Sequence, residues 1–298
     1  MTKIEQSYVI VDVFADEPLT GNPLAVVPDA DGLADGQMRA IAKEFNLSET
    51  TFLVQPTAAG AQWRLRSFTA GGAEVGGAGH NALGAWIWLA AAGRVSPSPR
   101  PYVQQIGADL LRVEVALDSQ QRVQVWMEQS PPAFGATARD RAELAAGLGL
   151  ALEDLTAGQP AQVVSTGAGH LLVEAVSRAA VDRARPDIAR LKAVLLAAGG
   201  EGAYLYSLDP LQPESGAVAY ARFFNPVAGI VEDPATGTAA GPLMAALVAR
   251  GVVPDGGSAV IEQGYLMGRP SRIRIDAAGP RIRIAARGLI VADGTLHL

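Results

Sequence analysis

The sequence lacks cysteine altogether: none occurs among its 298 residues. This absence excludes a disulfide framework, a cysteine-ligated zinc site, an iron–sulfur cluster and a thiol nucleophile. Histidine is scarce, with His80, His170 and His297 far apart, and no HExxH motif is present. We therefore expect no metal site and no cofactor.

Long hydrophobic runs and an excess of positive charge are also missing. The longest apolar stretch, residues 85–92, is far shorter than the ~20 residues that span a bilayer. Residues 1–6 carry an acid and an amide where a signal peptide has an apolar run. The formal net charge of −6 argues against a nucleic-acid or acidic-membrane partner. We expect a cytoplasmic protein without nucleic-acid or membrane partners.

The composition is that of a globular protein with a sizeable core. Hydrophobic residues make up 49% and charged residues 18% of the chain. The length fits one large domain or two ordinary ones. Alternating and β-branched runs predict strands in both halves. Apolar spacing predicts helices over residues 35–45, 80–92 and 188–198, and an Ala-rich helix after residue 238 that ends at residue 250.

A weak internal repeat relates the two halves. At an offset of 158, residues 74, 79, 80 and 82 correspond to residues 232, 237, 238 and 240. The alternative is chance, because glycine and alanine are common. If the repeat is real, each half places a Gly-rich loop at a helix N-terminus, which favours anion binding. We predict two α/β domains of similar topology, at about 1–125 and 126–285.

Four polar residues are candidates for chemistry. Glu49 lies between a helix and a strand; it is either a solvated turn carboxylate or, if buried near Phe52, a proton carrier with a raised pKa. His80 opens a helix and either packs or binds a ligand, and Asp233 either caps a helix or binds a ligand. Thr238 offers a loop hydroxyl. Together these groups suggest proton transfer.

Two other site types fit poorly. Residues 77–82 match GxGxxA, but no long buried strand leads into them and no acid follows about 20 residues later, so a dinucleotide site is disfavoured. Asp233, His80 and Ser165 could form a hydrolase triad by composition, but there is no GxSxG elbow.

Four ordered motifs make the sequence similar to a known family. They are residues 46–52 (NLSETTF), 76–80 (GGAGH), 232–238 (EDPATGT), and Gln263-Gly264 with residues 268–271; Phe14 with residues 21–23 also fits. Together they resemble the PhzF family of phenazine-biosynthesis isomerase-like proteins over nearly the whole chain.

The resemblance implies a diaminopimelate-epimerase-like fold. In that fold, two similar α/β domains each roll a mixed sheet around a central helix, and the active site lies between them. The last strand, about 286–298, would return to the first domain. Glu49 would be the acid/base residue, and the substrate-binding positions would be Gly79, His80, Asp233, Gly237 and Thr238.

Two departures from related proteins matter. The related epimerases use two cysteines, which would fall near Ala78 and Thr236, so two-thiol stereoinversion is excluded by composition. The PhzF family usually has Ala-Thr where this chain has Asn81-Ala82, and usually Ser at the position of Thr238. These differences leave the substrate open.

The sequence favours a cofactor-independent isomerase. It would move a proton on a small carboxylate-bearing substrate, an amino or hydroxy acid of ring type, by Glu49 acid/base catalysis. One alternative is an epimerase or racemase that works with a single carboxylate. The other is a non-catalytic small-molecule-binding protein on the same scaffold. We expect the protein to form a homodimer. Apart from its second copy, its expected partner is the small-molecule substrate.

Overall fold

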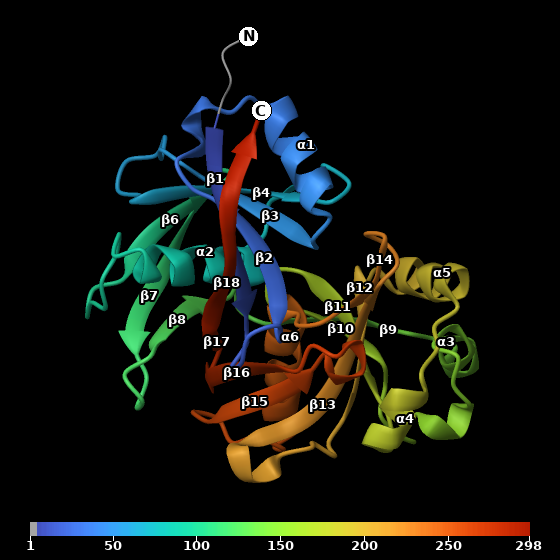
Figure 1. The fold of residues 1–298 in the computed structure, drawn as a ribbon. Helices are drawn as coiled ribbons and strands as arrows, with labels where there is room; N and C mark the ends of the chain where they lie inside the picture. The colour runs from blue at the N-terminus through green and yellow to red at the C-terminus, as the bar shows by residue number, and fades with distance from the viewer. Residues whose placement is uncertain (1–4) are drawn as a thin grey trace. The chain divides into compact units, whose positions relative to one another are not determined.

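The computed structural model describes residues 5–298, which divide into two compact units. Unit 1 comprises the described residues up to Glu128 together with Ala285–Leu298, and unit 2 comprises Gln129–Ile284. Residues 1–4, part of the segment examined above for a signal peptide, lie outside the described residues. Each unit combines helices with one mixed set of strands (Figure 1).

Unit 1 is built mostly from strands. Its elements are β1 (Glu5–Val13), β2 (Asn22–Val27), α1 (Asp35–Phe45), β3 (Glu49–Val54), β4 (Trp63–Thr69), β5 (Glu74–Val75), α2 (His80–Ala91), β6 (Tyr102–Ile106), β7 (Asp109–Leu117), β8 (Val123–Glu128) and β18 (Gly288–His297). The strands β18–β1–β2 pair antiparallel, β2–β3 parallel, β3–β4 antiparallel, β4–β6 parallel and β6–β7–β8 antiparallel.

The helix α2 is the core of unit 1. Every residue from His80 to Leu89 is buried, because the sequence of this helix is apolar on all sides. It packs against β1, β2, β3, β8 and β18. Gly84 allows the closest approach, since a Cβ there would lie 2.6 Å from side-chain atoms of both Val13 and Leu24.

Unit 2 has its own strands and helices. Its elements are β9 (Ala133–Thr137), α3 (Arg141–Gly147), β10 (Gln162–Ser165), β11 (Gly169–Glu174), α4 (Arg178–Arg183), α5 (Ile188–Ala198), β12 (Gly202–Ser207), β13 (Ala217–Asn225), β14 (Ile230–Asp233), α6 (Gly237–Ala249), β15 (Ser258–Gln263) and β16 (Ser271–Ala278), followed by β17 (Arg281–Ala286) at the boundary between the units. The central helix α6 is almost entirely buried and packs on β10, β11 and β16.

The two units repeat one pattern of strand pairing. In unit 2, β9–β10–β11 pair antiparallel, β11–β12 parallel, β12–β13 antiparallel, β13–β15 parallel and β15–β16 antiparallel, which is the order of β18, β1, β2, β3, β4, β6 and β7. The short strands β5 and β14 pair with β4 and β13 and lead into the central helices α2 and α6. The predicted fold class, two similar halves each with a mixed sheet around a central helix, is confirmed.

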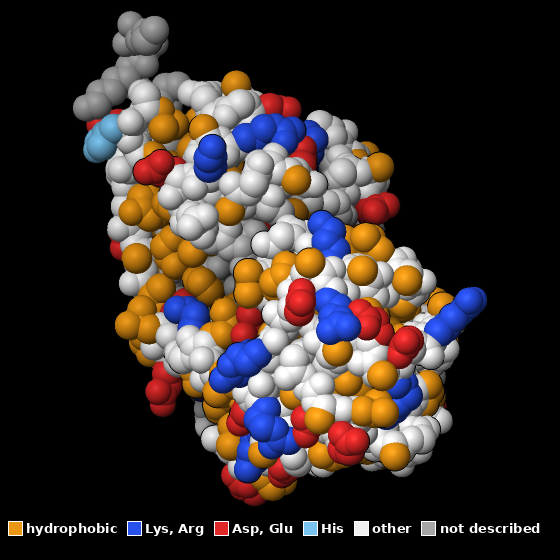
Figure 2. Space-filling model, turned by 90° about the vertical axis from the view of Figure 1, so that its right-hand side faces the viewer, with side chains coloured by type: hydrophobic (Ala, Val, Ile, Leu, Met, Phe, Trp, Pro, Cys, Tyr) orange, Lys and Arg blue, Asp and Glu red, His pale blue; other side chains and the backbone are white. Residues whose placement is uncertain are grey.

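Charges of both signs are distributed over the surface. Figure 2 shows Lys and Arg side chains interspersed with Asp and Glu on the face that it displays. Many of these charges pair locally, such as Arg190 with Glu143, whose closest atoms lie 2.6 Å apart. In the part of the chain that the structure describes, no helix combines the length and the apolar character needed to cross a bilayer.

Candidate functional site

In unit 1, two of the predicted residues lie together. Glu49 is the first residue of β3, just after Asn46 ends α1 in a left-handed conformation (φ 51°). His80 is the first residue of α2. The Oε2 atom of Glu49 lies 3.6 Å from Nδ1 of His80, and their side chains are 19% and 9% exposed. Glu49 is therefore a largely buried carboxylate beside an imidazole, not a solvated turn residue.

His80 is neutral near pH 7. Burial lowers the pKa of its imidazole to about 4, because the charged form loses its hydration. Within residues 5–298, its Nε2 atom has no hydrogen-bond partner. The distance of 3.6 Å to Glu49 is too long for a hydrogen bond but short enough for the carboxylate to favour the tautomer with the proton on Nδ1. That tautomer leaves Nε2 as an acceptor.

The side chain of Asn81 holds the glycine-rich loop in place. Its Oδ1 accepts a hydrogen bond from the backbone N–H of Gly79 (2.7 Å). Its Nδ2 donates to the carbonyl of Gly77 (3.0 Å) and to Oγ of Ser67 (3.1 Å), which in turn bonds Oγ1 of Thr51. In the sequence, Asn81 differs from the family pattern, and no structural role is apparent there. The available signal was an Asn just after Gly79, a type that bonds nearby backbone groups.

In unit 2, Asp233 belongs to a second buried polar cluster. It ends β14, is 6% exposed and accepts a hydrogen bond from Oγ1 of Thr236 (2.5 Å). Gln263 donates from Nε2 to the Asp233 carbonyl (2.7 Å) and to Thr236 Oγ1 (3.1 Å), and Tyr204 donates to Gln263 Oε1 (3.0 Å). The N-cap position of α6 is held by Thr236, so Asp233 is not the N-cap residue considered above.

His170 contacts Thr238, one of the predicted site residues, although no sequence pattern singled it out. It lies on β11, is 3% exposed, and its Nε2 atom is 3.3 Å from Oγ1 of Thr238 in the first turn of α6. Its ring meets Phe223 edge to face at 4.9 Å. Burial lowers its pKa to about 4. The available signal was a histidine placed directly before the apolar run of residues 171–173.

Unit 2 has no counterpart of the Glu49 carboxylate. Gly202 begins β12 as Glu49 begins β3, and Ala203 pairs with Phe224 as Thr50 pairs with Phe68. A Cβ at Gly202 would lie 2.5 Å from the ring of Phe223. The space is therefore filled by an aromatic ring, and only unit 1 carries a glutamate at this position.

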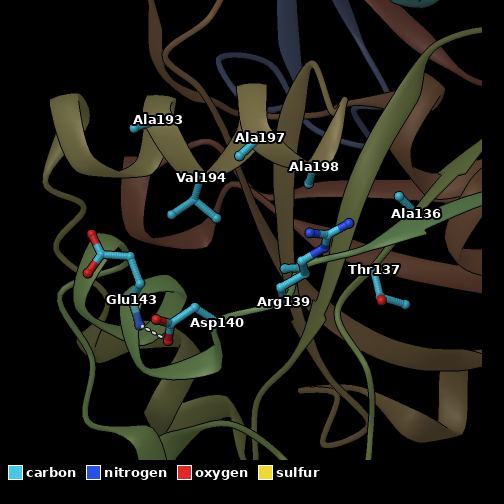
Figure 3. A pocket seen from close by; sticks show the side chains of 10 residues that line it. Ala136, Thr137, Arg139, Asp140, Glu143, Ala193, Val194, Ala197 and Ala198 are labelled. Atoms are coloured by element: carbon cyan, nitrogen blue, oxygen red, sulfur yellow. Dashed lines mark hydrogen bonds between the residues drawn. The ribbon is translucent and has the colours of Figure 1, made fainter.

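A cavity of about 480 Å³ opens elsewhere in unit 2, between β9, α3 and α5 (Figure 3). Small side chains of α5, among them Ala193 and Ala197, line it together with Arg139. None of the predicted site residues lines this cavity. The carboxylate of Asp140, which also lines it, accepts a hydrogen bond from the backbone N–H of Glu143 and so caps α3. The prediction that Glu49, His80 and Asp233 line one cleft stays a prediction.

Comparisons with known proteins identify the family. Residues 11–294 match the family model described as "Phenazine biosynthesis-like protein". A trans-2,3-dihydro-3-hydroxyanthranilate isomerase of Pseudomonas aeruginosa is 35% identical, over 98% of this chain and 99% of that protein. A PhzF-family protein of Bacillus anthracis superimposes with a TM-score of 0.90 at 25% identity, covering 99% of both chains. A hydroxyproline epimerase of Agrobacterium vitis shares the fold alone, with a TM-score of 0.65 at 13% identity over 100% of this chain and 93% of that one.

The fold and the match together define an isomerase on the diaminopimelate-epimerase-like scaffold. The chain belongs to the PhzF family of phenazine biosynthesis-like proteins. The resemblance drawn from the four sequence motifs is thereby confirmed.

Proposed function

We propose that the chain is a cofactor-independent isomerase that moves a proton on a small carboxylate-bearing substrate, with Glu49 as the group that removes and returns the proton. The observation that carries this proposal is the pairing of a largely buried carboxylate with a neutral imidazole, Glu49 with His80, at 3.6 Å. A buried carboxylate is suited to proton transfer, because desolvation makes it a stronger base than a solvated one.

The chemistry would run in two steps on one face of the substrate. Glu49 takes a proton from a carbon next to a conjugated system, and the bonding electron pair moves into that system. The protonated Glu49 then delivers the same proton to another carbon of the system, so a double bond has shifted and no atom is gained or lost. A single carboxylate returns the proton to the face from which it came. This favours isomerisation over inversion of a stereocentre, which needs acid and base on opposite faces.

The neighbouring groups suggest the class of substrate. With its proton on Nδ1, His80 offers Nε2 as an acceptor for an amino or hydroxyl group of the ligand. In unit 2, we assign Asp233, Gly237 and Thr238 to substrate binding. In unit 1, we assign Gly79 to substrate binding as well. The relative from Pseudomonas aeruginosa is named for a ring-type amino acid that also carries a hydroxyl. We propose a ring-type amino or hydroxy acid of this kind as the substrate.

The test is turnover of trans-2,3-dihydro-3-hydroxyanthranilate in D₂O by the wild type, Glu49→Gln and the control Glu44→Gln, which changes an exposed glutamate of α1. Glu49→Gln should lower kcat by roughly 10²–10⁴-fold, the usual contribution of general acid–base catalysis, with the fold and ligand binding intact. Glu44→Gln should match the wild type, and a chelator should leave the rate unchanged.

The outcomes separate the candidate functions. Undiminished kcat in Glu49→Gln contradicts the acid/base assignment, and loss of activity with chelator contradicts cofactor independence. Binding without turnover by the wild type for every ring-type candidate supports the non-catalytic binding protein. Deuterium incorporated with inversion at one carbon, and no double-bond shift, supports the epimerase or racemase.

A further inference from the structure

A buried histidine of unit 2 contacts the hydroxyl at the start of the central helix. His170 lies on β11 and Thr238 in the first turn of α6, so strand and helix must pack for the contact to form. Nε2 of His170 is 3.3 Å from Oγ1 of Thr238. The histidine is buried, whereas the Thr238 side chain is only partly so and can reach a ligand.

Hydrogen-bond accounting assigns the tautomer of His170. Burial keeps the ring neutral near pH 7, so it carries one proton. Within the described part of the chain, Nδ1 has no hydrogen-bond partner. A buried N–H without an acceptor is rarer and costlier than a buried acceptor without a donor. The proton therefore belongs on Nε2, from which it is donated to the hydroxyl oxygen of Thr238.

The orientation of the ring is fixed by its neighbours. Phe223 meets the imidazole edge to face, with an interplanar angle of 84°. Phe223 can occupy this place because Gly202 has no side chain: a Cβ there would lie 2.5 Å from the phenylalanine ring. Gly202 stands in unit 2 where Glu49 stands in unit 1. Because it has no side chain, it leaves room for the Phe223 ring that contacts His170.

We propose that His170 is a positioning residue: by donating from Nε2 to Thr238, it leaves the hydroxyl proton of Thr238 free to be donated to the anionic group of the substrate. A hydroxyl that already accepts one hydrogen bond directs its own proton elsewhere. The start of α6 carries the positive end of the helix dipole, which favours an anion at the same end. The anion in question rests on the proposed function, whereas the His170–Thr238 contact does not.

The first test is independent of any substrate. The chain has three histidines, so ¹⁵N-histidine spectra of the whole protein contain few signals, and the His170→Gln variant assigns the one in question. We expect the Nε2–H tautomer of His170 at pH 7, with a shift of its Nε2 resonance in Thr238→Val. A protonated ring, an Nδ1–H tautomer, or no response to Thr238→Val overturns the proposal.

The second test measures coupling in binding. The probe is 3-hydroxyanthranilate, an aromatic carboxylate, titrated into the wild type, His170→Leu, Thr238→Val and the double variant. Each single change should weaken binding about 10- to 100-fold, the range expected for one hydrogen bond that serves a charged group. The double variant should bind no more than about twofold more weakly than Thr238→Val. His170→Gln, which keeps an amide donor near the position of Nε2, should restore most of the affinity.

The outcomes distinguish this proposal from the proposed function. If the losses of affinity from the two single changes multiply in the double variant, His170 supports the fold without acting through Thr238. The same conclusion follows if His170→Gln does not restore the affinity. If the wild type does not bind the probe, the proposed substrate class is wrong, and the tautomer measurement alone decides the proposal. If His170→Leu does not fold, the comparison of His170→Gln with the wild type and Thr238→Val replaces it.

Discussion

Asn81 shows how one side chain can set the shape of a site without belonging to its chemistry. Its amide bonds the backbone of Gly77 and Gly79 and the hydroxyl of Ser67, and it is 1% exposed. His80, which follows Gly79, is held at the mouth of α2 by this loop. The loop geometry therefore depends on a buried polar network with every bond in place.

Asn81→Ala should lower the free energy of unfolding of unit 1. Three hydrogen bonds are lost and the N–H of Gly79 and the carbonyl of Gly77 lose this partner, so we expect a loss of about 2–4 kcal/mol. Urea unfolding followed by tryptophan fluorescence measures it. Ser67→Ala is the matched comparison. Alone, it should lower the unfolding free energy by less than Asn81→Ala does. Added to Asn81→Ala, it should cause little further loss. A loss below about 0.5 kcal/mol in Asn81→Ala would show that the loop is held by other contacts.

At the residue scale, sequence motifs located the groups but not their contacts. Glu49 and His80 were found because both stand in short, recognisable motifs. The contact between them depends on the position of β3 beside α2, which no local pattern encodes. His170 escaped because its partner Thr238 is far along the chain, and the two meet only when β11 packs on α6. The raised pKa expected of Glu49 stays a prediction.

At the scale of elements, strong periodicity was a reliable guide. The helix expected over residues 35–45 is α1 with the same bounds, because Met38, Ile41 and Ala42 form one buried stripe. Among the strands expected in the second half, β11 spans Gly169–Glu174, an apolar run in which four of the six residues are buried. The strand β9 was missed because its five residues, AFGAT, are all exposed and include a glycine. Short elements such as α4 carry too few turns for a periodic signal.

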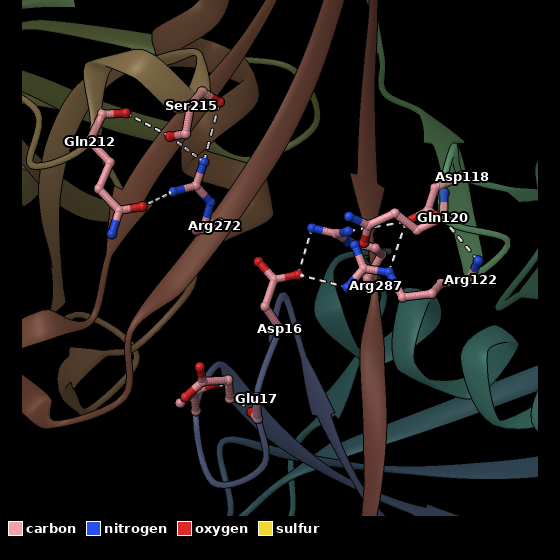
Figure 4. Close-up of polar contacts among 10 residues, drawn as sticks. Asp16, Glu17, Asp118, Gln120, Arg122, Gln212, Ser215, Arg272 and Arg287 are labelled. Carbon is pink, nitrogen blue, oxygen red and sulfur yellow. Dashed lines mark hydrogen bonds and ion pairs between the residues drawn. The ribbon is translucent and has the colours of Figure 1, made fainter.

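The last strand illustrates how charge pairs can assist an element. The single last strand expected at about residues 286–298 corresponds to β18, Gly288–His297, which pairs with β1 along nearly its whole length. Just before it, Arg287 contacts Asp16 at 2.5 Å and Asp118 at 3.0 Å, as Figure 4 shows. These ion pairs link the residue directly before β18 to two loops of unit 1.

Gly84 of α2 provides a prediction in which helix propensity and packing oppose each other. Alanine is favoured over glycine inside a helix by about 1 kcal/mol. A Cβ at Gly84, however, would lie 2.6 Å from atoms of Leu24 and of Val13, and overpacking of this kind costs about 1–3 kcal/mol. Because the side chains crowd it from two strands, packing should prevail. Gly84→Ala should lower the unfolding free energy by about 1–2 kcal/mol in a urea titration.

The matched control is Gly36→Ala in α1. A Cβ there would meet nothing within 4 Å, so only the backbone preference remains. We expect Gly36→Ala to raise the unfolding free energy by a few tenths to about 1 kcal/mol. If both alanine variants stabilise the protein, α2 does not pack against β1 and β2 as tightly as described.

On the scale of the whole molecule, the same strand-pairing pattern carries different polar side chains in the two units. In each unit, the central helix starts at a glycine or directly after one: Gly79 precedes α2, and Gly237 is the first residue of α6. Unit 1 adds Glu49 and His80, whereas unit 2 has Gly202 and Thr238 at the related positions and recruits His170 from a neighbouring strand. The repeat was visible in the sequence through its glycine positions. The difference between the polar side chains of the two units was not visible, because it depends on which side chain fills the space beside each helix.

Each unit also contains one buried, neutral histidine, and this predicts how stability depends on pH. Burial lowers the pKa of His80 and of His170 to about 4 in the folded protein, from about 6.5 in the unfolded chain. Between these values the unfolded state binds more protons than the folded state, so stability falls as the pH falls from about 6.5 towards 4. Between pH 7.5 and 5.5, we expect a loss on the order of 1 kcal/mol for each of the two histidines.

Urea unfolding at pH 7.5, 6.5 and 5.5 measures this loss, and histidine variants assign it. His170→Gln should reduce the dependence on pH in unit 2, and His80→Asn should do so in unit 1, because each removes one group that must stay neutral in the folded state. His297→Gln is the control, since that side chain is 58% exposed. An unchanged pH dependence in the variant with both buried histidines replaced would mean that other groups, not these imidazoles, set the stability above pH 5.5.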